Sequence, residues 1–181
     1  VRKTGICYHG TQVAVSGIMS EIIWDWLLND FDPKKVELDK CYPSFEEMEP
    51  RVKAAFDWLD DTHNAANECW ADYQKKLQRW HDHKAEFKAF LESFDEFKKA
   101  VAPWVKKPEY IADCMHKANA PTRYSKLNFP VDGKTVRWAV TNCHLMRNRF
   151  SVIDLLHFTG FWTDEFVQKL IERAEAMDAG L

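Results

Sequence analysis

The chain has 181 residues, 46% hydrophobic and 29% charged, which is typical of a folded domain with a sizeable core and excludes a disordered chain. Its formal net charge of −3 provides no basic field that would attract nucleic acid or an anionic membrane. No uncharged run approaches the roughly 20 residues that cross a bilayer, and residues 1–11 show no apolar signal-peptide core. The five cysteines are scattered and include no CxxC pair, so we expect a cytoplasmic protein without a disulfide framework.

Two elements are expected before the longest segment. Residues 1–11 are predicted to form a strand or an extended entry that ends at a glycine turn. Residues 12–31 place apolar side chains at i, i+3 and i+4, which predicts an amphipathic helix that ends before Asp32-Pro33. The apolar face of this helix consists of Val15, Ile18, Met19, Ile22, Ile23, Trp26 and Leu27.

The segment 44–102 dominates the chain. Ser44 and Glu47 match a capping box, although Glu49-Pro50 is an alternative helix start. Residues 50–102 contain no glycine, and apolar residues recur every three or four positions, as in a heptad repeat with a stutter at 73–77. This apolar stripe consists of Met48, Val52, Ala55, Leu59, Ala66, Cys69, Tyr73, Leu77, Trp80, Phe87, Leu91, Phe94, Phe97 and Val101.

Two arrangements of this segment stay open. Residues 60–64 are consecutive poor helix formers, and they include good helix N-cap types. An unbroken helix would span roughly 80 Å at 1.5 Å per residue, which exceeds the diameter of a globule of this size. The segment is therefore either one long amphipathic helix that projects or dimerises, or a helical hairpin broken near residues 60–64.

Shorter elements follow. Residues 109–119 predict a modest helix, and residues 150–179 predict a pair of helices that turn at Thr159-Gly160. Residues 124–142 alternate apolar and polar side chains on both sides of Asp132-Gly133, which predicts a β-hairpin, with residues 3–8 as the candidate third strand. The expected fold is a single mainly α domain over residues 1–181, with the hairpin as a minor α+β component.

Metal binding and nucleophilic catalysis are both disfavoured by residue spacing. Side chains two positions apart point to opposite sides of a helix, and adjacent side chains of an extended segment point to opposite faces. The zinc-type spacings CxxC and HxxxH are absent from the sequence. We therefore expect no bound metal, no cofactor and no catalytic residue. The pairs considered are His81/His83, Cys114/His116 and Cys143/His144.

One short motif points to a different class of protein. Tyr8-His9-Gly10-Thr11 lies between an expected strand and an expected helix. It resembles the opening motif of the diphtheria-toxin-like and poly-ADP-ribosyl ADP-ribosyltransferases. The resemblance implies that this motif would bind NAD, with His9 and Gly10 at the nicotinamide–ribose end. That family also has a split β-sheet with a late acidic residue, usually Glu, on a strand, whereas residues 110–164 contain no Glu.

A role with nucleic acid is a second alternative. Residues 152–158 and 163–174 have the outline of a helix-turn-helix, but the second helix begins with Asp and Glu, which phosphates repel. A basic group near the predicted hairpin is placed to contact a phosphate backbone, namely Lys134, Arg137, Arg147 and Arg149. Conversely, an acidic strip would imitate such a backbone; it consists of Asp57, Asp60, Asp61, Glu68 and Asp72.

The function that we predict is non-catalytic protein–protein interaction, as an adaptor, inhibitor or assembly subunit of the kind that phages and mobile elements encode. The aromatic-rich stripe is larger than its short neighbouring elements are expected to cover. A partner protein or a second copy would cover the remainder, which predicts a complex or a homo-oligomer and no contact with a membrane. The predicted partner-binding residues are Trp58, Trp70, Trp80, Phe87 and Phe94.

Overall fold

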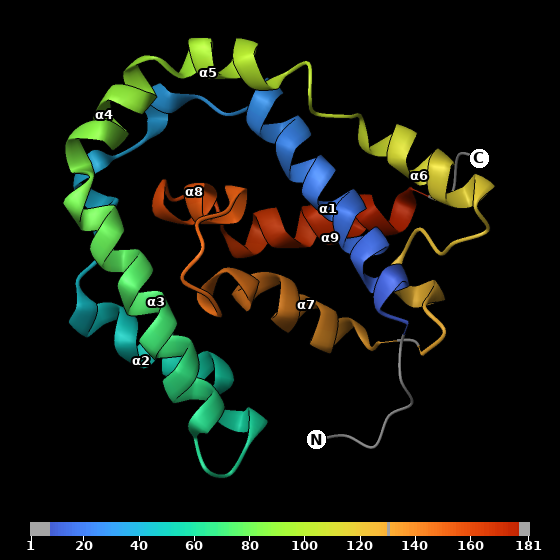
Figure 1. Ribbon diagram of the computed structural model, residues 1–181, viewed down its shortest axis with the longest axis horizontal. Helices are drawn as coiled ribbons and strands as arrows, with labels where there is room; N and C mark the ends of the chain where they lie inside the picture. The colour runs from blue at the N-terminus through green and yellow to red at the C-terminus, as the bar shows by residue number, and fades with distance from the viewer. Residues whose placement is uncertain (1–7, 130, 178–181) are drawn as a thin grey trace. The chain divides into compact units, whose positions relative to one another are not determined.

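The computed structural model of the chain describes residues 8–129 and 131–177. In those ranges it is mainly helical, with nine α-helices, several short 3-10 turns and no β-strand (Figure 1). The chain divides into two compact units. Of the described residues, unit 1 holds 32–94 and 141–163, and unit 2 holds 8–31, 95–140 and 164–177.

Unit 1 contains the first half of the segment 44–102. Helix α2 (Phe45–Phe56) begins at the predicted capping box: the amide of Glu47 donates to the Ser44 hydroxyl at 3.1 Å, and the amide of Ser44 donates to the Glu47 carboxylate at 2.7 Å. Two orphan amides of the first turn are thereby satisfied. The helix therefore starts after Ser44, and Pro50 lies inside it.

The chain then reverses direction, so the segment is a hairpin and not a single rod. After the 3-10 turn η3 (Asp57–Leu59), helix α3 (Asn64–Asp82) packs back along α2. His63 sits between them in the left-handed region with φ 59°. The Asp60 carboxylate accepts hydrogen bonds of 2.9 to 3.1 Å from the backbone amides of Thr62, Asn64 and Ala65. These bonds satisfy the first amides of α3, so the break at residues 60–64 is stabilised locally.

Helix α3 continues into α4 (Lys84–Glu92), which contacts the short turn η1 (Pro33–Lys35). A second short turn, η2 (Leu38–Lys40), leads toward α2. Helix α4 ends at Ser93, whose hydroxyl donates to the carbonyl of Ala89 at 2.8 Å. This side chain competes with the backbone for the carbonyls of the last turn, which favours an end to the helix.

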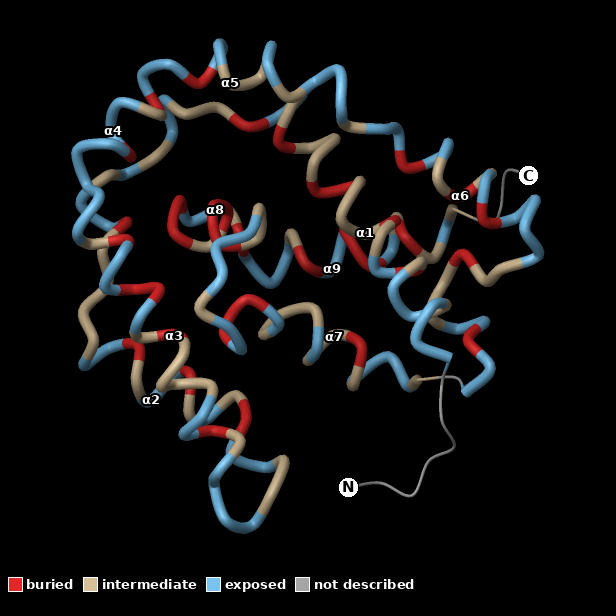
Figure 2. The backbone as a smooth tube through the Cα atoms, in the orientation of Figure 1, coloured by how far each residue is buried: buried red, intermediate tan, exposed pale blue. Residues whose placement is uncertain are grey.

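The predicted apolar stripe is buried in large part, and it forms the core of unit 1. Figure 2 shows buried positions recurring along α2 and α3. The Trp80 ring stacks on Phe158 with centroids 4.4 Å apart and contacts Phe87 at 4.3 Å, while its indole N–H donates to the carbonyl of Cys41. The buried stripe residues are Met48, Val52, Ala66, Tyr73, Leu77, Trp80, Phe87, Leu91 and Phe94.

Unit 2 is built on α1 (His9–Asn29), which packs against α6 (Pro108–Lys117) and α9 (Asp164–Ala176). The predicted apolar face of the first helix is confirmed, since Val15, Ile18, Ile22, Ile23 and Leu27 are buried. One cation joins the three helices. Arg173 contacts the carboxylates of Asp25 at 2.8 Å and Glu109 at 3.4 Å. Helix α5 (Phe94–Val101) belongs mainly to this unit.

The predicted β-hairpin at residues 124–142 is wrong. These residues form the 3-10 turn η4 (Tyr124–Lys126) and helix α7 (Gly133–Asn142). Asp132, expected in a two-residue turn, instead caps α7, because its carboxylate accepts hydrogen bonds from the amide of Thr135 at 2.9 Å and from its hydroxyl at 2.8 Å. Apolar residues at positions 136 and 140 fit a helix as well as a strand, since they are four apart.

The strand expected at residues 3–8 lies outside the described residues except for its last position. Tyr8 has extended backbone angles and serves as the N-cap of α1. The two helices expected at residues 150–179 are α8 (Val152–Phe158), in unit 1, and α9, in unit 2.

The cap at Asp132 provides a test of the helix that replaces the predicted hairpin. Asp132→Ala should lower the free energy of unfolding by about 1 kcal/mol, because the amide of Thr135 loses its acceptor. Asp132→Asn should retain most of the stability, since an amide oxygen also caps a helix. Urea unfolding followed by circular dichroism measures both. Equal stability of Asp132→Ala and the parent chain would contradict the cap.

Candidate functional site

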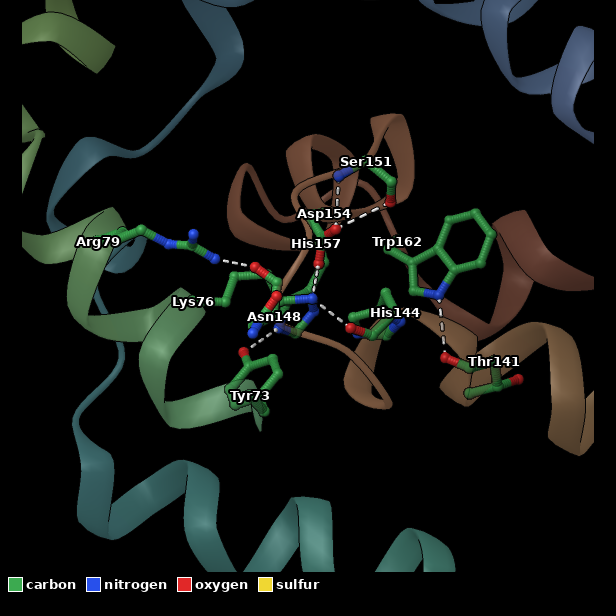
Figure 3. Close-up of polar contacts among 10 residues, drawn as sticks. All are labelled: Tyr73, Lys76, Arg79, Thr141, His144, Asn148, Ser151, Asp154, His157 and Trp162. Carbon is green, nitrogen blue, oxygen red and sulfur yellow. Dashed lines mark hydrogen bonds and ion pairs between the residues drawn. The ribbon is translucent and has the colours of Figure 1, made fainter. Parts of the chain in front are cut away.

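Unit 1 contains a buried cluster of ionisable side chains where α3, the 3-10 turn η5 (Cys143–Leu145) and α8 meet (Figure 3). The Lys76 ammonium lies 2.5 Å from the Asp154 carboxylate and also donates to the backbone carbonyl of His144. Lys76 and Asp154 are only 1% and 0% exposed. Lys76 of α3 is thereby joined to η5 and α8, whose contacting residues lie 68 and 78 positions later in the chain.

Asp154 has a second role at the start of α8. Its other carboxylate oxygen accepts hydrogen bonds of 2.8 Å from the backbone amide and from the hydroxyl of Ser151 (Figure 3). Ser151 and Asp154 thus form a capping box, which satisfies the helix terminus. One carboxylate both begins α8 and binds the lysine of α3.

Two histidines lie beside this pair. The Nε2 atom of His157 is 3.2 Å from the hydroxyl of Tyr73, and the rings of His144 and His157 are 4.4 Å apart. His144 is 4% exposed, and neither of its ring nitrogens has a hydrogen-bond partner among the described residues. Both rings are therefore held in a low-dielectric environment next to a buried ammonium.

Burial controls the protonation of the cluster. Desolvation lowers the pKa of His157 to about 3 and that of His144 well below its usual value, and the nearby Lys76 and Arg51 charges add to both shifts. Burial raises the pKa of the Tyr73 hydroxyl well above its usual value. Desolvation also raises the pKa of Asp154 and lowers that of Lys76, while the attraction between the two opposes each shift. The histidines and the tyrosine are neutral at pH 7.

These groups resemble an acid–base constellation in composition but not in accessibility. A catalytic acid or base has to reach a proton of the substrate at hydrogen-bond distance. Lys76 and Asp154 instead bind each other and the protein backbone, with almost no exposed surface. The cluster is best explained as a structural clamp between α3 and α8.

No motif in the sequence predicted this clamp. Lys76 lies three positions after Tyr73 and four before Trp80, so it shares the buried face of α3. A charged residue at such a position indicates a buried partner. Ser151 and Asp154 also have capping-box spacing. Neither signal identifies the partner, since Asp154 is 78 residues from Lys76.

The five predicted partner-binding aromatics are placed very differently. Trp80, Phe87 and Phe94 are buried, and Trp70 is half-buried against Tyr73. Trp58 is 60% exposed and lies in the turn between α2 and α3. We call residues 57–63 the α2–α3 tip.

The α2–α3 tip is ordered by its own side chains. The Asp60 carboxylate is held at a pKa of about 2, chiefly by the hydroxyl of Thr62 and then by the amide of Ala65. The Asp57 carboxylate contacts Nδ1 of His63. Trp58 is therefore presented on a turn whose backbone is fixed from both ends.

The acidic strip proposed as a phosphate mimic lies on the α2–α3 tip and along α3. Asp57, Asp60 and Asp61 belong to the tip, whereas Glu68 and Asp72 are on the helix. Residues 54–74 contain these five carboxylates and neither Lys nor Arg. Part of this charge is engaged, because Asp60 binds backbone amides and Asp72 lies 3.3 Å from Lys75.

The predicted basic group is divided between the two units. Lys134 and Arg137 are on α7 in unit 2, while Arg147 and Arg149 belong to unit 1. Arg137 binds within its own unit, to the side chain of Gln168 at 2.5 Å and to the carboxylate of Asp164 at 3.4 Å.

The motif that resembles ADP-ribosyltransferases forms the start of α1. His9 and Gly10 are exposed, and a Cβ atom added at Gly10 would meet no heavy atom within 4 Å. The described part of the chain has no strand from which a split sheet would be built. It also has no group of three or more His, Cys, Asp or Glu side chains arranged to hold a metal ion. None of its helices is both long and apolar enough to cross a membrane.

Comparison with protein-family models, with curated proteins and with solved structures finds no match to this chain.

The buried pair makes a double-mutant prediction. Lys76→Met should lower the free energy of unfolding by about 3–5 kcal/mol, because it leaves the Asp154 carboxylate buried without its counter-charge. Adding Asp154→Asn removes that charge and keeps a cap for α8, so the double variant should be more stable than Lys76→Met alone. Urea unfolding of all four proteins gives the coupling. Strictly additive losses would show that the two side chains do not act as a pair.

The buried histidines make a prediction about pH. Their pKa values are lower in the folded than in the unfolded chain, so stability is fully present above pH 6.5 and decreases as the pH falls toward 3. His157 should contribute a loss of about 2 kcal/mol between pH 7.5 and pH 5.0, and His144 should add a loss of the same sign. Urea unfolding at the two pH values measures the loss. His157→Phe should reduce it, and an unchanged loss in His157→Phe would contradict the assignment.

Proposed function

We propose that the chain is a non-catalytic protein–protein interaction protein and that the α2–α3 tip is its binding element. The observation that carries the proposal is the 60% exposure of Trp58 on a turn ordered by Asp60. Tryptophan is enriched among the residues that dominate binding energies at protein interfaces. A tryptophan on a fixed turn loses little conformational freedom on binding, so more of its contact energy contributes to affinity.

The charge around Trp58 defines the class of partner. Asp57, Asp60 and Asp61 surround the indole in sequence, and the nearest Lys or Arg residues are Lys53 and Lys75. Carboxylates of this kind steer association and disfavour acidic partner surfaces. The indole of Trp58 supplies affinity when a partner buries it. The partner surface should therefore combine an apolar pocket for one ring with basic side chains at its edge.

The buried stripe supports this assignment by elimination within unit 1. Trp80, Phe87 and Phe94 are covered by other residues of the chain, so a partner would have to unfold the core to reach them. Trp58 differs from these three rings, because a partner contacts it without unfolding the core.

The test compares two tip variants with a control. Trp58→Ser and Asp61→Lys should each abolish capture of the partners that the tagged parent chain retains in a quantitative pulldown. Asp61 is exposed, so its variant should fold normally even if Trp58→Ser loses stability. Phe129→Ser changes a 42% exposed aromatic of unit 2 and should capture the same partners as the parent chain.

Circular dichroism and thermal unfolding establish that each variant is folded. Retention of the same partners by both tip variants would show that the α2–α3 tip is not the binding element.

A further inference from the structure

Unit 2 contains a pocket at the end of α1. It is lined by the last turn of α1, by the end of α5 and by the segment that leads to α6. The apolar part consists of Leu28, Ala102 and Val105, and the volume is about 250 Å³. This is smaller than the roughly 300–1,000 Å³ of typical small-molecule sites, so the pocket suits one large side chain better than a cofactor.

The edge of this pocket is basic. Lys98, Lys106 and Lys107 line it, and none of the three makes an ion pair with a described residue. The one lining carboxylate, Asp25, is already bound to Arg173 at 2.8 Å and to the side-chain amide of Asn29 at 3.0 Å. The lysines therefore present positive charge that has no ion-pair partner within residues 8–129 and 131–177.

The pocket and the α2–α3 tip are complementary in charge and in apolar character. Residues 97–108 contain four lysines and no acidic residue, whereas residues 54–74 contain five acidic residues and neither Lys nor Arg. The pocket offers apolar side chains with lysines at the edge; the tip offers one exposed indole surrounded by aspartates. The lysines at the pocket edge match the aspartates of the tip in charge, and the apolar lining matches the indole.

We propose that the occupant of this pocket is the α2–α3 tip of a second copy of the chain. Trp58 of one copy contacts Leu28 and Val105 of the next, and Asp57 and Asp61 face the lysines. The contact joins two different surfaces, so each copy carries one tip and one pocket. This inference rests on the proposed function, because it names the partner of the same binding element.

The contact should be weak and sensitive to salt. A single anchored side chain buries much less surface than the 1,200–2,000 Å² of a stable interface. Its exposed charges are screened within about a Debye length, roughly 10 Å at 0.1 M salt. The mass-average mass should therefore increase with protein concentration in low salt and return toward that of one chain in 0.5 M NaCl.

Sedimentation of charge-reversed variants tests the inference directly. Asp61→Lys and Lys106→Glu should each weaken self-association by about tenfold, since like charges then meet across the contact. An equimolar mixture of the two variants should associate with nearly the parent affinity, because the acidic tip of Lys106→Glu meets the unchanged pocket of Asp61→Lys. Lys126→Glu, a matched reversal of an exposed lysine in unit 2, should associate like the parent chain.

Three results would overturn the inference. They are a chain that stays monomeric to millimolar concentration in low salt, variants that associate like the parent, and a mixture that fails to associate. None of these results overturns the proposed function. If the α2–α3 tip binds a different protein, Trp58→Ser still abolishes its capture in the pulldown. If the chain does not self-associate and both tip variants retain the same partners, the two proposals are overturned together.

Discussion

The buried pair of Lys76 and Asp154 is the constraint on which unit 1 depends. Apolar side chains attract one another without direction, so a core made only of rings and aliphatic groups permits small slides of one helix along another. A buried ammonium tolerates no such slide, because its attraction to the carboxylate has to offset the cost of removing both charges from water. We infer that the pair sets the position of α8 on α3. Since Asp154 also caps α8, the same carboxylate determines where that helix begins and what it packs against.

The starts of several helices use the same physical solution. The first amides of a helix lack intrahelical acceptors, and a short polar side chain just before the helix satisfies them. Ser44, Asp60, Asp132 and Ser151 with Asp154 each supply such acceptors. At Asp60 the same kind of bond fixes the α2–α3 tip, on which we propose that Trp58 anchors a partner.

The aromatic side chains are divided between the core and the surface of the chain. Because the segment 44–102 folds back on itself, the rings of its stripe pack on one another and on α8, as the stacking of Trp80 on Phe158 illustrates. The stripe is therefore covered in large part within the chain, while Trp58, in the turn after α2, is 60% exposed. The two surfaces that we propose for binding, the α2–α3 tip and the lysine-edged pocket, both lie where helices end.

The sequence by itself predicted most of the helices, because a period of three to four residues and a capping side chain act within a few positions of the chain. It predicted the apolar face of α1 in this way, and the capping box at Ser44 was one of two starts that it left open for α2. It did not decide between strand and helix at residues 133–142, since positions 136 and 140 satisfy both periods and Asp132 is equally suited to a turn and to a cap. Only the tertiary structure decided that α2 and α3 form a hairpin and that Lys76 meets Asp154. Both depend on contacts between residues distant in sequence, whose free energy no local pattern contains.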